Sequence, residues 1–438
     1  MGCEGNVQAA GARPEADFVP PAIARQVVSP SAYADWEAIH RSFAELRHNI
    51  PLGLVDTPGF DPFWLVTKHA DVMEISRQPL IFSNNDHRCA LLSQSAERQY
   101  LENRETAPFF RVLITMDPPE HSIYRRLTFK NFTPKGIRGL EEDIRALAIE
   151  SIDEMAAQGN MCDFAERVAL RYPLRVILSL MGLPREDEDM MLRLTQELFN
   201  PQDPEISKSH SSVDESEASS YDLGALAEFK QFFSDLIKAR RANPTDDIAS
   251  VIANATVDGK LLSEWDVTSQ YIAILTAGHD TTSSSTAGGV GALAESPEQF
   301  TMVKNDRSLV PALVEECVRW TSPLLSFMRT AERDYSLRGQ TIRKGDWMML
   351  SYPSANRDEE VFEDPFTFKA NRAPNPQIGF GYGPHICLGQ HLGRLEMRIF
   401  FEEFFRRVRS IELAGPVERS RSINVSAIKR MPVRFTMA

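Results

Sequence analysis

Cysteine is scarce in this chain, and the few cysteines show no pairing pattern. Five of them are spread over 438 residues, at positions 3, 89, 162, 317 and 387. Neither their odd number nor their spacing is typical of a disulfide framework, which favours a reducing compartment with mostly buried, unreactive thiols.

A long apolar run is also missing. The N-terminal residues, MGCEGNVQAAGARPEADFVPP, contain neither a stretch that could cross a bilayer nor the apolar core of a signal peptide. We therefore expect no membrane span, a cytoplasmic location and a flexible leader over residues 1–15.

Basic residues are outnumbered, and internal repeats are absent. The chain has 61 acidic and 48 basic residues, a formal net charge of −13, which argues against nucleic acid as a partner. No segment of roughly 20 to 50 residues recurs, which excludes solenoids and propellers.

The pattern that is present is mainly helical. Leu and Ile recur at helical spacing over residues 136–158, and the apolar residues 169–184 predict an interior helix that ends at Gly182 and Pro184. Strand patterns open residues 63–75, fill residues 346–355 and form a pair within residues 423–437. The sequence therefore predicts a helix-dominated α+β protein.

One tract, residues 203–222, is strongly polar and lies between two amphipathic segments. Its composition predicts a mobile loop, which is either a solvated connector or a lid over a pocket.

A long helix is predicted from a capping box at Ser263 and Asp266 to Pro297. Its centre is unusual, because residues 279–282 are polar where an interior helix should be apolar. Either a polar stripe faces solvent, or the helix bends beside a ligand, with Gly278 giving room and Asp280 and Thr281 handling protons.

Cys387 stands in the segment FGYGPHICLGQ, residues 380–390, directly before an amphipathic run. His385, Cys387 and His391 could contribute to a zinc site, but structural zinc needs four ligands and no second pair of ligands lies nearby. A buried structural thiol is the common alternative for a lone cysteine.

The neighbouring glycines favour a third interpretation of Cys387. Gly381 and Gly383 permit tight turns, and Gly389 leaves room for a flat ligand. The start of the following helix should lower the pKa of the thiol and offer N–H groups to a sulfur anion. These are the requirements of a thiolate ligand to haem iron.

This segment resembles the haem-binding loop of the cytochrome P-450 superfamily, F-G-x-G-x-H-x-C-x-G. The fixed positions are filled by Phe380, Gly381, Gly383, His385, Cys387 and Gly389. AGHDTT, starting at Ala277, is similar to the superfamily's central-helix motif, EECVRW contains its E-x-x-R, and DPPEHSIYRR fits its H-x-x-x-R helix. These matches occur in family order from about residue 15 to the C-terminus.

The resemblance implies a fold and a set of site residues. The fold is mainly α (α+β), with a large α-rich lobe and a smaller β-rich lobe, in one domain spanning residues 1–438. Cys387 is the implied ligand of haem b iron, Asp280 and Thr281 the implied proton relay, and residues 203–222 the implied lid. Further residues implied to contact the haem or its propionates are His121, Arg125, Ala277, Gly278, Arg329, Phe380, Gly381, His385 and Gly389.

The resemblance also implies a structural ion network formed by Glu316, Arg319 and Arg372. The chain departs from the family at Lys369, where an acidic residue often stands, which puts the local pairing in question.

The implied activity is that of a haem-thiolate monooxygenase, which uses O2 to hydroxylate an unactivated C–H bond. The runs LTAGHDTTSSS and CLGQHL are most similar to the soluble, bacterial, terpineol-hydroxylating branch, which implies a monomer with a small apolar substrate, a monoterpene or an aromatic hydrocarbon. Substrate-pocket walls are expected from residues 84–112, 195–230, 270–281 and 324–328.

Electrons must come from separate proteins, because the chain carries no flavin or iron–sulfur motif. The expected partners are a [2Fe-2S] ferredoxin and its NAD(P)H-dependent reductase. The expected docking face carries Arg125, Arg126, Lys130, Arg394 and Arg398. Two other classes stay open: a haem-thiolate peroxygenase or isomerase, which would not need the pair Asp280 and Thr281, and a non-enzymatic haem sensor, for which no output segment is visible.

Overall fold

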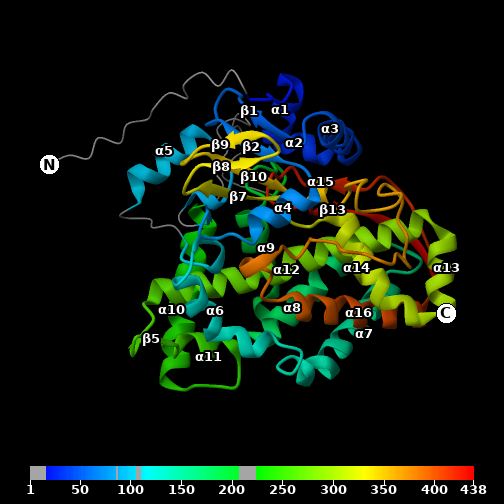
Figure 1. The fold of residues 1–438 in the computed structure, drawn as a ribbon. Helices are drawn as coiled ribbons and strands as arrows, with labels where there is room; N and C mark the ends of the chain where they lie inside the picture. The colour runs from blue at the N-terminus through cyan, green and yellow to red at the C-terminus, as the bar shows by residue number, and fades with distance from the viewer. Residues whose placement is uncertain (1–15, 85–86, 105–109, 207–222) are drawn as a thin grey trace.

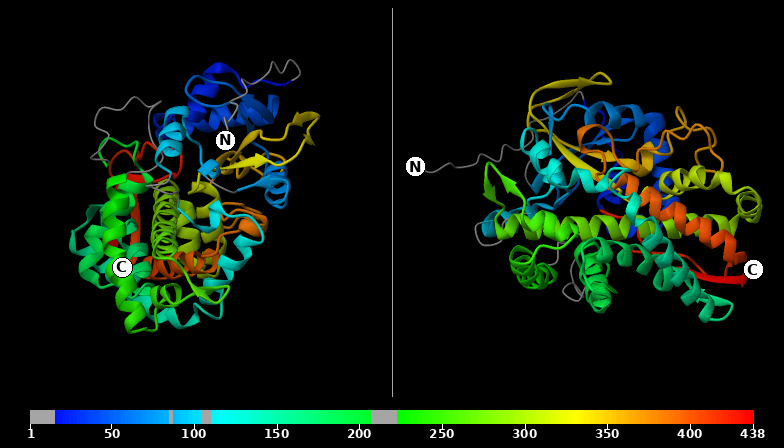
Figure 2. Two further views of the ribbon diagram at one scale, coloured as in Figure 1. Left: turned by 90° about the vertical axis from the view of Figure 1, so that its left-hand side faces the viewer. Right: turned by 90° about the horizontal axis from the view of Figure 1, so that it is seen from below.

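The longest element is helix α12, Glu264–Glu295, which runs through the helical part of the molecule (Figures 1 and 2). In the computed structural model, residues 16–84, 87–104, 110–206 and 223–438 are described. The side chain of Ser263 caps the helix by accepting a hydrogen bond from the backbone N–H of Asp266 at 3.0 Å. At Pro297 the next helix begins, so both predicted ends are confirmed.

Most of the polar centre of α12 is buried, and hydroxyl groups along the helix bond to its own carbonyls. Ser284 Oγ donates to the carbonyl of Asp280 at 2.8 Å, and Thr286 Oγ1 donates to that of Thr282 at 2.8 Å. Such bonds to the carbonyl four residues earlier satisfy hydroxyl groups that burial removes from water. The polar stripe therefore does not face solvent.

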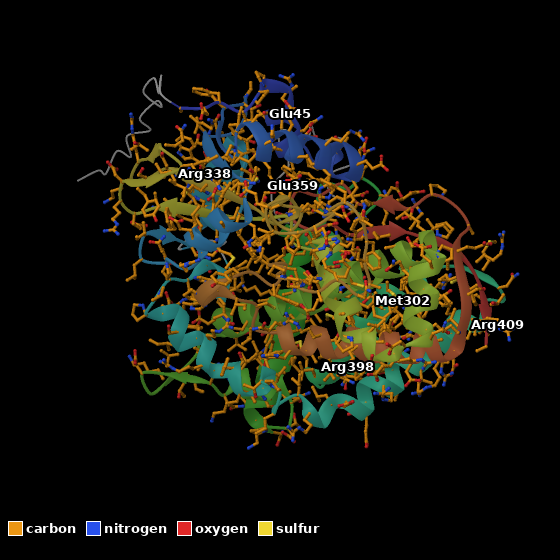
Figure 3. All side chains as sticks on the ribbon, turned by 45° about the vertical axis from the view of Figure 1, so that its right-hand side comes forward. Glu45, Met302, Arg338, Glu359, Arg398 and Arg409 are labelled. Carbon is orange, nitrogen blue, oxygen red and sulfur yellow. The ribbon has the colours of Figure 1, made fainter. Side chains whose placement is uncertain are left out.

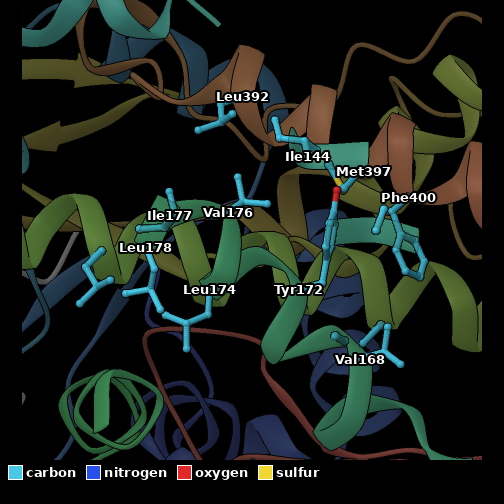
Figure 4. Packing of buried hydrophobic residues seen from close by; sticks show 14 of the residues in the cluster. Ile144, Val168, Tyr172, Leu174, Val176, Ile177, Leu178, Leu392, Met397 and Phe400 are labelled. Carbon is cyan, nitrogen blue, oxygen red and sulfur yellow. The ribbon is translucent and has the colours of Figure 1, made fainter. Parts of the chain in front are cut away.

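The α-rich lobe surrounds α12. Its other helices are α6 (Glu120–Thr128), α7 (Glu141–Ala157), α8 (Arg171–Leu180), α9 (Glu188–Phe199), α10 (Leu223–Ala242), α11 (Ile248–Ala253), α13 (Pro297–Asn305), α14 (Val310–Thr321) and α16 (Gln390–Arg407). The two helices predicted within residues 136–158 and 169–184 are α7 and α8. Figure 4 shows the core at their contact with α16, where Tyr172 of α8 lies beside Phe400.

The β-rich lobe is built on a five-stranded sheet, seen at the top of Figure 1 with α1–α3 beside it. The sheet order is β1 (Leu52–Val55), β2 (Phe63–Val66), β10 (Trp347–Ser351), β7 (Ser326–Ala331) and β3 (Phe82–Ser83). The two strands predicted near residues 63 and 347 are neighbours in this sheet, parallel, with Trp347 opposite Phe63. Every residue of β2 and β10 is buried, as expected for inner strands.

The remaining helices of this lobe are α1 (Pro21–Val28), α2 (Pro30–Ala34), α3 (Trp36–Asn49), α4 (His69–Ser76), α5 (Gln94–Asn103) and α15 (Tyr352–Ala355). Two hairpins add four short strands: β5 (Thr256–Val257) with β6 (Lys260–Leu261), and β8 (Tyr335–Leu337) with β9 (Gln340–Ile342).

The two C-terminal strands form as predicted, but they do not pair with each other. β13 (Ile428–Arg430) pairs with β12 (Glu418–Arg419), whereas β14 (Pro432–Met437) lies between β11 (Val408–Leu413) and β4 (Met161–Asp163). The backbone N–H of Met431, between the strands, donates to Asp163 Oδ1 at 3.1 Å. This tie to a segment that lies far away in sequence directs β14 into the second sheet.

The predicted leader and most of the predicted lid lie outside the described residues. The first residues of the polar tract are described, and they are anchored. Asp203 is fully buried, and its Oδ2 accepts hydrogen bonds from the backbone N–H of Arg421 at 3.0 Å and from Lys429 Nζ at 3.3 Å. The first residue of the polar tract is therefore tied to the C-terminal region by hydrogen bonds.

The predicted ion network is present and fully buried. Glu316 accepts from Arg319 Nε at 2.7 Å and from Arg372 Nε at 2.9 Å. At the unusual Lys369, the backbone N–H donates to Glu316 at 2.9 Å, and Nζ donates to Asp364 at 2.8 Å. The departure from the family pattern thus leaves the pairing of Arg372 intact.

Among the described residues, no helix combines the length and the apolar character that a membrane span requires.

Candidate haem-binding site

The loop that carries Cys387 is shaped by its glycines. Gly381 and Gly383 have φ angles of +75° and +73°, a region that favours glycine. A Cβ atom on Gly383 would also lie 2.4 Å from the carbonyl oxygen of Ser76, so α4 can approach only a glycine here. The backbone N–H of Cys387 closes the loop by donating to the carbonyl of Phe380 at 2.8 Å. The tight turns predicted from the sequence are confirmed.

The thiol of Cys387 lies just before α16, where Gly389 is the N-cap. Cys387 is exposed, although many protein atoms surround the thiol. Desolvation by these atoms raises the thiol's pKa, although the N–H of Gly389 and the charges of Arg125 and Arg394 act to lower it. The predicted lowering of the pKa is therefore wrong for the protein alone, because desolvation outweighs the helix start.

The space beside the thiol is open. A Cβ atom built on Gly389 would meet no atom within 4 Å other than Cys387 Sγ, at 4.0 Å.

The geometry does not support a zinc site at Cys387, because within the described ranges no three His, Cys, Asp or Glu side chains are grouped to bind a metal.

Four of the residues implied to contact the haem or its propionates form one cluster near this loop: His121, Arg125, Arg329 and His385. The rings of His121 and His385 lie 4.2 Å apart, and each Nε2 is buried with no hydrogen-bond partner in the described part of the chain. Burial lowers the pKa of His385 to about 2, helped by Arg329, His121 and Arg125. Burial and Arg125 also lower the pKa of His121. Both imidazoles are therefore neutral hydrogen-bond donors flanked by permanent cations.

The centre of α12 has one uncovered face and one tightly packed face. Ala277 is exposed although it lies mid-helix, whereas His279 and Asp280 are buried. Gly278 faces α8, because a Cβ atom there would lie 2.4 Å from Cδ1 of Ile177. The room that Gly278 provides is thus taken by a neighbouring helix, which sequence reasoning did not anticipate.

The two residues predicted to handle protons have different surroundings. Thr281 is half-buried, and its hydroxyl donates to the carbonyl of Ala277 at 2.8 Å. Asp280 is buried, and its Oδ1 accepts a hydrogen bond from Nε2 of Gln196 on α9. Burial raises the pKa of Asp280 to about 8, against the lowering effect of Gln196. Gln196 was missed from the sequence, because nothing in an amphipathic helix marks a glutamine that faces another helix.

These observations test whether the residues fit a haem group. A thiol beside open space, two neutral imidazoles with unpartnered Nε2 atoms and two guanidinium groups match the iron ligand and the propionate partners of haem b. Together with the helix-rich fold and its small β lobe, these side chains define a haem-thiolate protein.

Comparison with known sequences agrees with this class. The profile of the Cytochrome P450 family matches residues 62–414. Cytochrome P450-terp from a Pseudomonas species is 44% identical over 424 residues, 96% of this chain and 99% of that protein. The Steroid C26-monooxygenase of Mycolicibacterium smegmatis is 36% identical over 403 residues, 90% of each chain.

Solved structures give the same result. CYP108D1 from Novosphingobium aromaticivorans superposes with a TM-score of 0.87 and 42% identity, covering 96% of this chain and all of that one. Cytochrome P450 CYP268A2 of Mycobacterium marinum, in complex with pseudoionone, has a TM-score of 0.84 and 30% identity, with coverage of 97% and 100%. The chain belongs to the cytochrome P450 family. It is therefore a monooxygenase, an oxidoreductase that uses haem b.

Proposed function

We propose that this enzyme hydroxylates a small apolar molecule, a monoterpene or an aromatic hydrocarbon, with O2 and with electrons from a ferredoxin. The observation that carries the site assignment is the meeting of Cys387 with His121, Arg125, Arg329 and His385 at one place.

In this proposal Cys387 binds the iron as a thiolate, and the N–H of Gly389 and the charges of Arg125 and Arg394 stabilise the anion. His121 and His385 donate from Nε2 to the propionates, and Arg125 and Arg329 neutralise their charge. When bound, the haem supplies dioxygen activation and oxygen transfer to the C–H bond.

The chain's own contribution to proton transfer comes from α12. Thr281 lies one turn from the exposed Ala277, and its hydroxyl is held by the carbonyl of Ala277 at 2.8 Å. Asp280, protonated near neutral pH because of its raised pKa, is a proton donor on the α9 side of the same helix. We assign the two as consecutive members of the proton path.

The choice of an apolar substrate rests on the relatives. Leu325, the residue before β7 and one of the expected wall residues, is 2% exposed and packs in the apolar core of the β lobe, so it lines no open pocket. Among the relatives, the name P450-terp and the bound pseudoionone point to compact or open-chain terpenoids rather than charged molecules. A panel of monoterpenes and aromatic hydrocarbons, scored by hydroxylated product per NADH, identifies the preferred class.

The ferredoxin assignment is supported by unpaired basic residues close to Cys387. Arg126 and Lys130 are exposed and have no ion-pair partner within the described ranges, and Phe129 between them is 49% exposed. They follow Arg125, whose charge acts on the thiol of Cys387. An acidic ferredoxin would meet this face by electrostatic steering.

Two of the cations expected on the docking face are paired with carboxylates. Arg394 is held by Glu315 at 2.6 Å. Arg398, on α16 in Figure 3, is held by Glu402 at 2.7 Å and by Glu141 at 3.1 Å. Their charges are compensated, so we assign steering to Arg126 and Lys130.

The proposed ligand is tested by replacing cysteines one at a time. Only a thiolate ligand gives the carbonyl complex of reduced haem its red-shifted absorption, so Cys387→Ser should abolish that band. Cys162→Ser is the matched control, since Cys162 lies in β4 and should leave the spectrum unchanged. An unaltered band in the Cys387 variant contradicts the assignment.

A further inference from the structure

His279 lies between Gly278 and Asp280 on α12, and the proposed mechanism leaves it without a role. It is fully buried, with both ring nitrogens close to polar atoms of other elements. Nε2 lies 2.7 Å from the carbonyl oxygen of Leu170, and Nδ1 lies 3.2 Å from Thr195 Oγ1. Nδ1 is also 3.5 Å from Oδ1 of Asp280.

The carbonyl of Leu170 decides the tautomer of His279. A carbonyl oxygen only accepts, so Nε2 must carry the hydrogen and donate it. Burial lowers the pKa of His279 to about 4, so the ring is neutral at physiological pH. Nδ1 is therefore left with a lone pair, which can only accept a hydrogen bond.

The anchor on Leu170 is rigid. A π-helical turn, Ala165–Ala169, directly precedes Leu170, and the N–H of Leu170 donates to the carbonyl of Ala165 at 2.9 Å. Such turns often occur at functional sites. Gly278 lets Ile177 of α8 approach α12 one residue before His279. The imidazole is thus held in one orientation by tightly packed neighbours.

Two groups could donate to the lone pair of Nδ1. The hydroxyl of Thr195 has a single hydrogen, and the carbonyl of Leu192 competes for it at 3.0 Å. The other candidate is the carboxyl of Asp280, whose Oδ1 lies 3.5 Å from Nδ1 and also accepts a hydrogen bond from Gln196. The second oxygen, Oδ2, finds no hydrogen-bond partner in the described part of the chain. A lone pair beside this carboxyl repels the ionised form and attracts the protonated form.

The charged side chains on the elements packed around Asp280 are paired with one another. On α9, Arg193 pairs with Glu197 at 3.1 Å; on α8, Arg175 pairs with Glu188 at 2.9 Å; on the π-helical turn, Arg167 pairs with Glu166 at 3.6 Å. Burial raises the pKa of Asp280, and the hydrogen bond from Gln196 acts to lower it. The cations named above are held by other carboxylates and not by Asp280.

We propose that His279 is a positioning residue for proton delivery: anchored on Leu170, its neutral ring presents Nδ1 to Asp280 and keeps that carboxyl in the protonated, donating form. This inference rests on the proposed role of Asp280 and adds a group that, together with burial, favours its protonated form.

The test measures the carboxylic acid of Asp280 directly, in the resting holoenzyme. Infrared difference spectra over a pH series should show a protonated carboxyl band that shifts in D2O and is lost in Asp280→Asn. In His279→Gln, the side-chain N–H can still reach Leu170, but the acceptor at the Nδ1 position is gone. The midpoint of the band should fall by about one pH unit, the order of one lost hydrogen bond. His279→Phe, which removes both bonds, should show at least the same fall.

Thr195→Val is the matched control, because it removes the competing neighbour of Nδ1 and leaves His279 in place. Its midpoint should stay within a few tenths of a unit of the wild type. The fraction of NADH recovered as product should follow the midpoints, falling at lower pH in His279→Gln than in the wild type.

An unchanged or raised midpoint in a His279 variant that retains its haem spectrum overturns the proposal, as does the lack of a protonated band in the wild type at neutral pH. If His279→Phe fails to incorporate haem, the band midpoint of His279→Gln decides whether the proposal holds. The infrared result needs no turnover, so it stands apart from the test of the monooxygenase site at Cys387.

Discussion

Asp280 and Thr281 are neighbours on α12 but belong to different surroundings. Asp280 is turned toward Gln196 on α9 and is buried, whereas Thr281 is half-buried beside the exposed Ala277. Successive helical residues point about 100° apart, so one residue can contact the bulk of the protein while the next faces the site. The proposed proton path across the helix would use this difference.

Replacing Thr281 tests the last member of that path. Thr281→Ala should still oxidise NADH in the presence of substrate, but product per NADH should fall severalfold as peroxide forms instead, because the hydroxyl that directs the proton is missing. Thr286→Ala is the control: Thr286 makes the same bond to a carbonyl four residues earlier, at 2.8 Å, but is fully buried. Peroxide and product are measured together, and undiminished coupling removes Thr281 from the mechanism.

The raised pKa of Asp280 also affects stability. The folded pKa is about 8 against an ordinary value of 3.8, so between these values the folded state holds a proton that the unfolded state has lost. Wild-type stability therefore falls as pH rises through this window. Asp280→Asn lacks this penalty and should be more stable at pH 7, by on the order of a few kcal/mol.

Urea unfolding at several pH values measures this difference. The gain of Asp280→Asn over the wild type should be small near pH 4 and should grow up to pH 8. A gain that does not change with pH would show that the titration of Asp280 is not its cause.

At the scale of elements, close helix contacts hold α12 in place. A Cβ atom on Gly288 would lie 2.2 Å from Thr321 Oγ1, and one on Gly289 would lie 2.2 Å from Cys317 Sγ, both on α14. α14 also carries Glu316 and Arg319 of the buried ion network. The glycines of α12 thus position the helix against the element that anchors the segment before the Cys387 loop.

Adding one methyl group at this contact should destabilise the protein. Gly289→Ala gains about 1 kcal/mol of helix propensity, but overpacking a filled interior costs about 1–3 kcal/mol, and both Cys317 and Phe401 would have to move. We expect a lower midpoint of urea unfolding. Gly139→Ala is the control, since a Cβ atom there meets nothing within 4 Å. Equal effects of the two variants would refute the close contact.

At the scale of the whole molecule, the charge of −13 would be expected to repel an acidic ferredoxin. Exposed charges are screened over about 8 Å at physiological salt, so the local surface matters more than the total. Arg126 and Lys130 are exposed on one side of α6 and the turn after it, whereas many other surface cations are held by carboxylates.

Reversing both charges tests this face. The double variant Arg126→Glu with Lys130→Glu should keep its haem spectrum and substrate binding, because Arg125 is untouched. Its reduction by ferredoxin should slow by roughly tenfold or more at low salt and lose most of its dependence on ionic strength. Arg398→Glu is a comparison at a cation already compensated by Glu402 and Glu141. If ferredoxin reduces the double variant at the wild-type rate across a salt series, the docking face lies elsewhere.

The sequence by itself determines the local features of this protein, such as helix ends and tight turns. A cap at Ser263, a proline at 297 and glycines at 381 and 383 act through a few neighbouring atoms, so the ends of α12 and the turns of the Cys387 loop follow from residue types. The buried strands β2 and β10 likewise follow from unbroken apolar runs. The motifs also indicated which residues share the site, because their order matches that of a known family.

Tertiary structure alone decided how these parts act on one another. The partner of β14 is set by Asp163, some 270 residues earlier, the space at Gly278 by Ile177, and the partner of Asp280 by Gln196 on another helix. The pKa of Asp280 is raised because the surrounding protein excludes water from it, which a local sequence does not record. Contact and desolvation depend on which segments meet in space, and that is a property of the folded chain.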